Sequence, residues 1–374
     1  MTTQLYLCST PLHCLNAVAI ASTQAQGDAH LWLIDQPSIV DNTYFTVLSN
    51  WQRSPFRSVQ IAQGHIKSTG KKLAQRKQTF LALKTWIEQH KPTVIYTGND
   101  RRIEFQYAMH CATHIGLNPI GIYMDEGTFT YVGRHLSSSF SDRIVDNYLK
   151  KITYGFWWRN PPTIGGSDWI TQAYAAFPEL VHPLLQSKTL IPLQPLYHDN
   201  AVLQSFSTEL AHFFNAPIDV LTTLDCVLTL PHESIIADIP GYLDAMKTVV
   251  AKLQERGLHT GIKYHPRNSN PDILDAKTLP GVELLPHQIP FEALLPLLPK
   301  NVIIIGDVSS TLINSRWLKP EARLISIANP KVALYEEFCH FFSAIDVSSC
   351  QIDQLTGALE TIMHNQRIEQ NDRT

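Results

Sequence analysis

The sequence predicts an α/β protein with two domains, each built on a parallel sheet with helices on both faces. Short apolar segments alternate with longer segments of helical periodicity, and this alternation is typical of parallel sheets. It occurs twice, on either side of a region rich in Trp, Pro and Gly. The length of 374 residues also exceeds one typical domain of about 100–200 residues. These three observations together favour two domains over one.

The first series begins with a strand, a turn and a helix. Residues 5–8 are apolar and predicted as the strand, Ser9-Thr10-Pro11 as the turn, and residues 12–21 as the helix. Further strands are predicted at 30–34, 58–61, 93–97 and 120–124, and helices at 77–89 and 102–115. The alternation predicts a doubly wound sheet, because parallel strands need crossover connections.

The second series begins near residue 226. Residues 147–200 have weak periodicity, and we interpret them as the end of the first domain plus the connection. Its strands are predicted at 226–230, 259–264, 282–285, 302–305 and 324–326, with helices at 241–256 and 351–364. We expect an N-terminal Rossmann-like domain at 1–200, a second at 201–350, and a C-terminal helix and tail at 351–374. Two such halves facing a central cleft describe the GT-B architecture, and many two-domain α/β enzymes share this pattern.

Charge and cysteine content exclude several classes of protein. The 30 basic and 33 acidic residues give a net charge of −3, so no uniform positive field is available to bind a nucleic acid. The six cysteines form no CxxC pair and have no histidine at zinc-site spacing, so we expect reduced thiols.

The sequence contains no targeting or membrane-spanning pattern. The N-terminus lacks the basic and apolar regions of a signal peptide, and no run of about 18 apolar residues occurs. We therefore expect a cytoplasmic protein. A basic run of Lys67, Lys71, Lys72, Arg76 and Lys77 is typical of a solvated helix face, but leaves open peripheral association with the inner face of the cytoplasmic membrane.

An acidic pair, Asp125-Glu126, follows the predicted strand at 120–124, and Gly127 allows a sharp turn after it. Open α/β sheets bind ligands at the carboxyl ends of their strands, so a carboxylate here could act as a general base. The alternative is that Asp125 caps the next segment and Glu126 is solvated. Adjacent side chains point in different directions, so we expect only one of the pair to be the base.

A histidine ends the predicted strand at 259–264. His265 precedes Pro266, which favours an extended backbone and fixes where the imidazole points. It could donate a proton or a charged hydrogen bond to a phosphate, with Lys263 and Arg267 adding positive charge. The alternative is a structural role, because the chain has 16 histidines.

A serine pair, Ser309-Ser310, lies between the predicted strand at 302–305 and a helix-like run. Hydroxyl and backbone N–H groups at a helix N-terminus can bind an anion. The alternative is a simple serine N-cap. Between the two loops, Glu292 falls in the first turn of a predicted helix.

Several common motifs are absent from the sequence. No GxGxxG follows the first strand, and no P-loop, G-x-S-x-G elbow or HExxH occurs. The 98–100 segment, Gly-Asn-Asp, is not a DxD metal motif. The sequence therefore gives no reason to expect a metal or a cofactor.

The three loops, taken in order, resemble the D/E-D/E-G, His-Pro and Ser-Ser motifs of bacterial sialyltransferases of the GT-B type. The matching residues are Asp125-Glu126-Gly127, His265-Pro266 and Ser309-Ser310. The opening segment at 5–12 is similar to the start of the capsule polysialyltransferases and the lipooligosaccharide sialyltransferases. Glu292 matches a further position of these families.

The resemblance implies an inverting, metal-independent glycosyltransferase. Such an enzyme moves sialic acid (Neu5Ac) from CMP-sialic acid to a hydroxyl of a cell-surface glycan, a galactoside or sialoside of lipooligosaccharide or capsule. Glu126 would be the base, with Asp125 as a supporting or alternative carboxylate, and His265 would bind and protonate the leaving phosphate. Other positions would bind CMP: Ser309 and Ser310 would bind its phosphate, Glu292 its ribose, and Lys263 and Pro266 would line the pocket near its nucleobase. Gly127, Ser9, Thr10 and Pro11 would form an acceptor or fold-supporting loop.

Several alternatives stay open at this point. The donor could be another CMP-activated nonulosonic acid, such as pseudaminic or legionaminic acid, or Kdo. A GT-B-like nucleotide-sugar epimerase and a non-catalytic glycan-binding protein of a capsule complex are more distant readings of the same fold. The sequence leaves open the acceptor, the linkage, single addition against polymerisation, and a homodimer.

Overall fold

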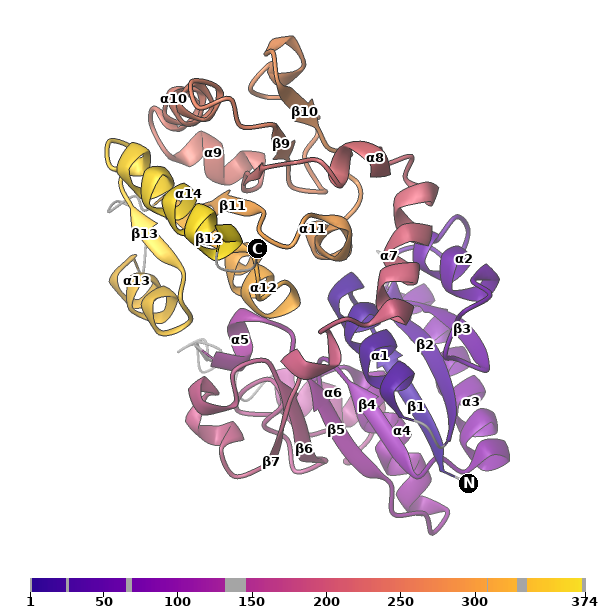
Figure 1. Ribbon diagram of the computed structural model, residues 1–374. Helices are drawn as coiled ribbons and strands as arrows, with labels where there is room; N and C mark the ends of the chain where they lie inside the picture. The colour runs from indigo at the N-terminus through magenta and orange to yellow at the C-terminus, as the bar shows by residue number, and fades with distance from the viewer. Residues whose placement is uncertain are drawn as a thin grey trace. The chain divides into compact units, whose positions relative to one another are not determined.

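Two parallel sheets organise the chain, one in each of two units (Figure 1). The computed structural model describes residues 2–24, 27–64, 69–131, 146–307, 309–327 and 335–371. Unit 1 is Met1–Phe206 and unit 2 is Ser207–Thr374. The division falls within helix α7 (Ala201–Phe213), close to the predicted boundary at residue 200.

Unit 1 contains a seven-stranded sheet in the order β3-β2-β1-β4-β5-β6-β7, with every pairing parallel. Its strands are β1 (Thr3–Cys8), β2 (Asp28–Gln36), β3 (Ser58–Gln63), β4 (Val94–Thr97), β5 (Ile120–Met124), β6 (Ile170–Ala175) and β7 (Thr189–Pro192). The strand order reverses direction between β1 and β4, and open α/β sheets bind ligands beside such a reversal.

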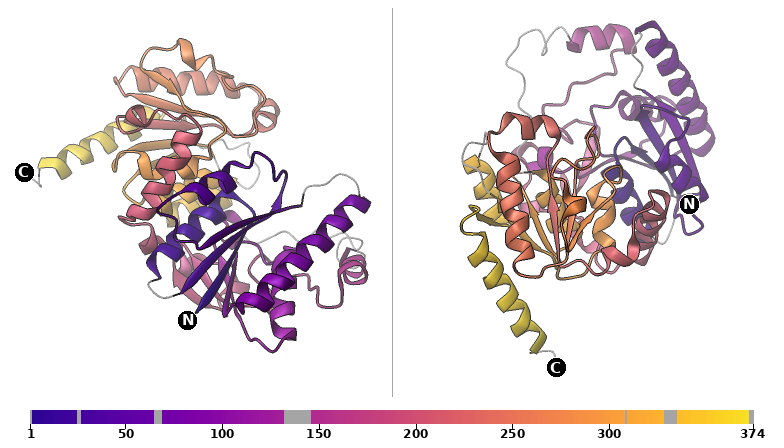
Figure 2. Two further views of the ribbon diagram at one scale, coloured as in Figure 1. Left: turned by 90° about the vertical axis from the view of Figure 1, so that its right-hand side faces the viewer. Right: turned by 90° about the horizontal axis from the view of Figure 1, so that it is seen from above.

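The helices of unit 1 cover both faces of this sheet. They are α1 (Pro11–Thr23), α2 (Thr43–Asn50), α3 (Thr69–His90), α4 (Ile103–His114), α5 (Thr128–Tyr131) and α6 (Asp146–Tyr154). Helix α1 lies on one face, and α3 and α4, which pack on each other, lie on the opposite face (Figure 2). This arrangement confirms the doubly wound sheet predicted for the first half.

Strands β6 and β7 lie in the region at 147–200, which was interpreted as the end of the first domain plus the connection, and neither strand was predicted there. Neither strand has a strong sequence signal. β7 is a four-residue edge strand, no residue of it is fully buried, and it ends at Pro192, which cannot donate to a neighbouring strand. Their pairing depends on the sheet that the earlier strands have already formed.

Unit 2 contains a six-stranded parallel sheet in the order β10-β9-β8-β11-β12-β13. Its strands are β8 (Cys226–Thr229), β9 (Thr260–Lys263), β10 (Val282–Leu284), β11 (Ile303–Gly306), β12 (Arg323–Ile327) and β13 (Ser348–Cys350). Its helices are α8 (Ile218–Leu221), α9 (Glu233–Asp238), α10 (Tyr242–Gln254), α11 (Phe291–Leu294), α12 (Ser310–Leu318), α13 (Tyr335–Ala344) and α14 (Leu355–Asn371). The five strands of the second predicted series are thereby confirmed, together with the helices at 241–256 and 351–364, whereas strand β13 and helices α8, α9 and α13 were not predicted.

The C-terminal helix α14 packs back on α10 (Figure 1). Lys252 donates to the Thr356 hydroxyl at 3.1 Å, and Arg256 pairs with Glu360 at 2.9 Å. Leu355 and Leu359 are buried in the core of unit 2. The helix therefore covers one face of this sheet.

The central strands are buried on both sides, as expected for sheets covered by helices. All residues of β8, β9 and β11 are buried, and β1 is buried from Gln4 onward. The six cysteines form no disulfide, as predicted, and all but Cys339 are buried.

Helix α3 carries most of the basic run noted in the sequence. Lys71 and Lys77 are exposed, whereas the Arg76 guanidinium lies over the Tyr154 ring, 5.1 Å from its centroid. Lys67 lies outside the described residues. Within the described ranges, no helix combines the length and apolar character needed to cross a bilayer.

Candidate active site

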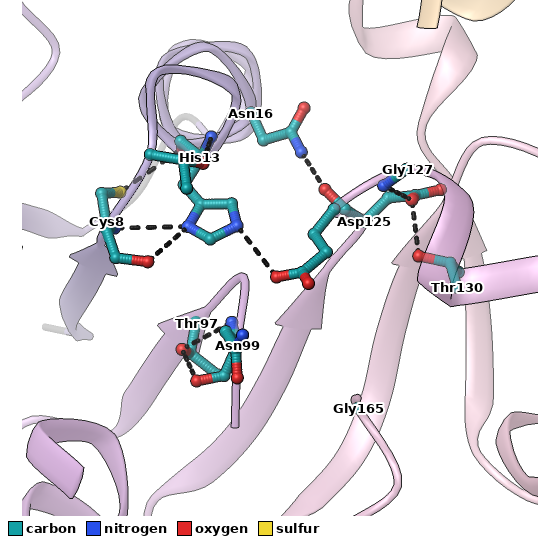
Figure 3. Close-up of polar contacts among 12 residues, drawn as sticks. Cys8, His13, Asn16, Thr97, Asn99, Asp125, Gly127, Thr130 and Gly165 are labelled. Atoms are coloured by element: carbon teal, nitrogen blue, oxygen red, sulfur yellow. Dashed lines mark hydrogen bonds and ion pairs between the residues drawn. The ribbon is translucent and has the colours of Figure 1, made fainter. Parts of the chain in front are cut away.

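The acidic pair lies where the chain leaves β5 at the carboxyl edge of the unit 1 sheet (Figure 3). Asp125 and Glu126 follow the last strand residue, and Gly127 then adopts a φ of 94°, a left-handed conformation that favours glycine. The glycine lets the chain turn directly into α5. Gly127 therefore supports the fold of this loop.

Asp125 is fully buried and its carboxylate is fully engaged. Oδ1 accepts from the Gly127 N–H at 2.8 Å and the Thr130 hydroxyl at 2.7 Å. Oδ2 accepts from the Ala176 N–H at 2.9 Å and from the Tyr131 hydroxyl. Burial raises the pKa of Asp125, and these four donors oppose the rise. This carboxylate joins the β5 loop to the end of β6, and neither of its oxygens is left to accept a hydrogen bond from a substrate.

Glu126 is differently placed, although it is the next residue. Its side chain keeps 13% of its surface exposed, and its Oε2 lies 3.5 Å from Nε2 of His13. Its backbone N–H donates to the Tyr123 hydroxyl at 3.3 Å, which fixes the main chain. The structure therefore assigns different environments to the two carboxylates, as the alternation of side-chain direction predicts.

His13 comes from the first turn of α1 and points toward the acidic loop (Figure 3). Thr10 caps the helix, because its hydroxyl accepts the His13 N–H at 3.3 Å, and Pro11 occupies the first turn. The Ser9 N–H donates to His13 Nδ1 at 3.2 Å. Ser9, Thr10 and Pro11, predicted as an acceptor or fold-supporting loop, form the turn that holds this imidazole.

A second contact joins α1 to the acidic loop. Asn16 donates from Nδ2 to the Asp125 carbonyl at 2.7 Å, and its own Oδ1 accepts from the Tyr197 hydroxyl (Figure 3). Asn16 is fully buried. The amide therefore fixes the distance between the helix and the loop.

The loop after β4 contributes another buried carboxylate. Asp100 accepts from the Gly165 N–H at 2.9 Å and the Ser167 N–H at 2.8 Å. Burial raises the pKa of Asp100 to about 6, and the nearby Glu126 contributes to the rise. Asp100 holds the loop at 163–167 beside the site.

Sequence reasoning missed His13, Asn16 and Asp100 as members of the site. A histidine in the first turn after β1 could have been noticed, because that turn faces the same sheet edge as the acidic pair. Asn16 and Asp100 carry no comparable signal, since their partners are up to 181 residues away along the chain.

In unit 2, Lys263 ends β9 with its ammonium turned inward. Nζ donates to the Tyr264 carbonyl at 2.7 Å and the His287 carbonyl at 3.0 Å, and the side chain is buried. Burial lowers the pKa of Lys263 to about 7, while Glu292 opposes the shift. The lysine joins the end of β9 to the loop after β10.

His265 is partly exposed at the carboxyl edge of the same sheet. Its Nδ1 accepts the Arg267 N–H at 3.2 Å, which assigns the proton of the neutral ring to Nε2. The His232 ring lies edge-on at 5.2 Å. Burial, together with Arg267, lowers the pKa of His265 to about 4, so the ring is neutral at pH 7. Pro266 follows it and is also partly exposed.

Ser309 and Ser310 begin α12 at the end of β11. Ser309 is the N-cap residue, but its side chain makes no capping hydrogen bond. Glu292 in α11 accepts from Asn314 Nδ2 of α12 at 3.0 Å, so the two short helices are joined. In the sheet, β8 separates the strand ends that carry His265 and the serine pair. The structure thus gathers the predicted donor-binding residues along one sheet edge of unit 2.

Among the described residues, no group of three or more His, Cys, Asp or Glu side chains is arranged to hold a metal ion.

The folds of known structures resemble this chain over nearly its full length. An alpha/beta-galactoside alpha-2,3-sialyltransferase from Photobacterium phosphoreum has 15% identity and a TM-score of 0.55, covering 95% of this chain and 99% of its own. A UDP-GlcNAc 2-epimerase from Neisseria meningitidis, bound to UDP-GlcNAc, has 10% identity and a TM-score of 0.56, covering 98% and 93%. At these identities the likeness shows the fold alone, and it confirms the predicted GT-B class.

Sequence comparison identifies the family. No curated protein sequence matches the chain. The family model described as Alpha-2,8-polysialyltransferase (POLYST) matches residues 4–327, a span that includes the acidic pair, the His-Pro pair and the serine pair. The chain therefore belongs to the alpha-2,8-polysialyltransferase family, and the predicted resemblance to sialyltransferases, which are glycosyltransferases, is confirmed.

Proposed function

We propose that this sialyltransferase moves Neu5Ac from CMP-Neu5Ac to a hydroxyl of a galactoside or sialoside glycan, with Glu126 as the general base. One observation carries the choice of base. Both carboxylate oxygens of Asp125 accept hydrogen bonds, from four donors in total, whereas the Glu126 carboxylate is partly exposed. Family membership supports the reaction class.

The proposed reaction inverts the anomeric centre. The acceptor oxygen forms a bond to the anomeric carbon as the bond from that carbon to the CMP phosphate breaks, and Glu126 takes the hydroxyl proton. The transition state resembles an oxocarbenium ion, so negative charge grows on the leaving phosphate. The base and the phosphate-binding groups must therefore act on opposite sides of the sugar.

His265 and the serine pair are suited to receive that charge. The neutral His265 ring presents its Nε2–H as a donor, because Nδ1 is already engaged by the Arg267 N–H. A phosphate beside it favours the protonated ring, so His265 can also supply a proton to the leaving group. Ser309 and Ser310 add hydroxyls at the start of α12, where the helix favours an anion. In this scheme these groups stabilise the phosphate without a metal.

Glu292 and Pro266 complete the proposed CMP site. Glu292 would accept from the ribose hydroxyls, with Asn314 fixing its carboxylate. Pro266 would contact the cytosine ring. Lys263 would support this pocket through the carbonyls it binds.

The test is the Glu126→Gln variant, assayed by CMP release from CMP-Neu5Ac in the presence of a galactoside or sialoside. A general base contributes about 10²–10⁴-fold, so turnover should fall by that factor while CMP affinity by calorimetry stays within about 2-fold. Glu88→Gln, on the exposed face of α3, is the matched control and should keep full activity. Full activity of Glu126→Gln would show that another group is the base.

The donor is tested in the same assay. CMP-activated Neu5Ac, legionaminic acid, pseudaminic acid and Kdo are offered in turn, and UDP-GlcNAc tests the epimerase alternative. Release of CMP from one of the first four supports the transferase, whereas conversion of UDP-GlcNAc alone would overturn it. The cytoplasmic location, the peripheral membrane association and the homodimer stay predictions.

A further inference from the structure

We propose that His13 is a positioning residue for Glu126, which it orients by donating a hydrogen bond from Nε2. This inference rests on the proposed function, because it assigns a role toward the proposed base. His13 lies outside the acidic, His-Pro and serine motifs.

The hydrogen bonds around the ring determine where its proton lies. Nδ1 accepts the Ser9 N–H at 3.2 Å, so the neutral ring carries its proton on Nε2. The Ser9 hydroxyl lies 3.3 Å from the same Nδ1. The N–H on Nε2 therefore points away from α1 and toward the Glu126 carboxylate.

Among the described residues, Glu126 is the acidic group that lies beside that N–H. The His13 side chain is 1% exposed, and Nε2 makes no hydrogen bond among the described residues. A buried donor without an acceptor costs about 1–3 kcal/mol. Glu126 Oε2, at 3.5 Å, needs to approach only slightly to accept it, and this gives the partly exposed glutamate one preferred orientation.

Gly98 forms the opposite wall of the imidazole site. A Cβ at this position would lie 2.1 Å from His13 Nε2 and Cδ2, far inside van der Waals contact. The φ of Gly98 is outside the left-handed region, so the need for glycine comes from space and not from conformation. A turn in which the Asn99 N–H donates to the Thr97 hydroxyl at 3.1 Å holds this wall in place.

The proposed role follows from this confinement. A ring held between α1 and Gly98 directs one carboxylate oxygen of Glu126 toward itself and leaves the other for the acceptor hydroxyl. His13 keeps its own proton throughout, so the acceptor proton passes only to Glu126.

Other ionisable groups also face Glu126 and must be held constant in the test. Asp100, in the loop after β4, and Tyr123, on β5, both interact electrostatically with it. The adjacent Asp125 is separately engaged by its four donors. These groups are unchanged when variants of His13 are compared with the wild type, so that comparison measures the contribution of the histidine alone.

The experiment compares His13→Leu and His13→Gln, each in the wild-type and Glu126→Gln backgrounds. His13→Leu should lower kcat about 10–100-fold with the donor KM within about 2-fold. His13→Gln keeps an N–H donor and should stay within about 5-fold of wild type. In the Glu126→Gln background His13→Leu should add less than about 2-fold, because the carboxylate it orients is gone.

Gly98→Ala provides an independent variant that keeps the histidine. It should lower kcat as His13→Leu does, because the new methyl displaces the ring. Gly357→Ala, on α14, is the matched control, since a Cβ there meets nothing within 4 Å. Thermal unfolding of every variant identifies any loss of fold. If His13→Leu is unfolded, His13→Gln and Gly98→Ala decide whether His13 positions Glu126.

Three results would overturn the inference. One is an unchanged kcat in both His13→Leu and Gly98→Ala while Glu126→Gln is inactive. This result would reject the role of His13 but would leave the proposed function intact. Another is equal loss of kcat in His13→Gln and His13→Leu. The third is a full additional loss from His13→Leu in the Glu126→Gln background. Full activity of Glu126→Gln, in contrast, would reject the proposed base itself.

Discussion

The carboxyl edges of the two sheets are built in different ways. In unit 1 the polar side chains are buried and largely engaged, with four donors on Asp125 and a buried ring at His13. In unit 2 the ring of His265 is partly exposed and held through Nδ1, and the side chain of Ser309 makes no capping hydrogen bond. At the unit 1 edge most of these polar groups are bonded to other groups of the protein, whereas the unit 2 edge presents hydrogen-bond donors to a ligand.

This difference matches the two tasks of the proposed reaction. A base must be oriented by the protein, because the acceptor hydroxyl is neutral and exerts little force on a carboxylate. A phosphate is charged, so it can order hydroxyl and N–H donors as it binds. Substitutions at the unit 1 edge should therefore affect both fold and activity, and those at the unit 2 edge mainly activity.

The largest effect that sharpens the comparison is expected for His265→Ala. Turnover should fall about 10²–10⁴-fold, because the leaving phosphate loses a hydrogen-bond donor and a proton source. The midpoint of thermal unfolding should stay within about 2 °C, since the ring is partly exposed. CMP release and thermal unfolding measure the two quantities, and His340→Ala on the exposed face of α13 is the control. A large loss of stability would place His265 among the structural histidines.

The next effect is expected for Asp125→Asn in unit 1. Each carboxylate oxygen accepts a backbone N–H, so an amide placed in either orientation directs its NH₂ at a donor that cannot turn away. The free energy of unfolding should fall by about 3 kcal/mol. Urea unfolding measures it, and Glu126→Gln, measured in parallel, should change it by less than about 0.5 kcal/mol. Equal changes in both variants would remove the distinction between the two carboxylates.

The smallest effect concerns Lys263 in unit 2, whose buried ammonium donates to two backbone carbonyls. The pKa of Lys263 is about 7 in the folded protein against 10.5 for an ordinary lysine. Between these values the unfolded chain binds a proton that the folded chain lacks, so stability should rise with pH across this window. Lys263→Met removes the titrating group and should show a smaller rise in urea unfolding between pH 7 and pH 9. Parallel pH dependence in wild type and variant would mean that the lysine stays charged in the fold.

The fold was predictable where a strand is a short run of apolar or β-prone residues. β1 to β5 and β8 to β12 were predicted from such runs, and they include β3 and β10, which lie at sheet edges. β6, β7 and β13 were missed: β6 falls in a region of weak periodicity, β7 has no buried residue, and β13 is Ser348–Cys350 with only one buried position. These strands form because a neighbouring strand is present.

The candidate site was predictable where function requires a short local motif. Asp125, Glu126, His265 and the serine pair all follow strands at the two sheet edges, as the sequence predicts. The division of roles between Asp125 and Glu126 could not be predicted, because it depends on a hydrogen bond from the Ala176 amide, 51 residues away. His13 was missed for the same reason, since its relation to Glu126 exists only in the folded sheet.

The bond from the Ala176 amide to Asp125 also limits how this site can be transplanted. A chimera that exchanges only the acidic segment brings a carboxylate whose buried partner belongs to a different parent chain. The smallest exchangeable module runs from the end of β5 through β6, and it includes a region with little recognisable pattern. Enzyme engineers who recombine relatives of this protein should place crossovers outside that span, even where the motif alone invites a shorter exchange.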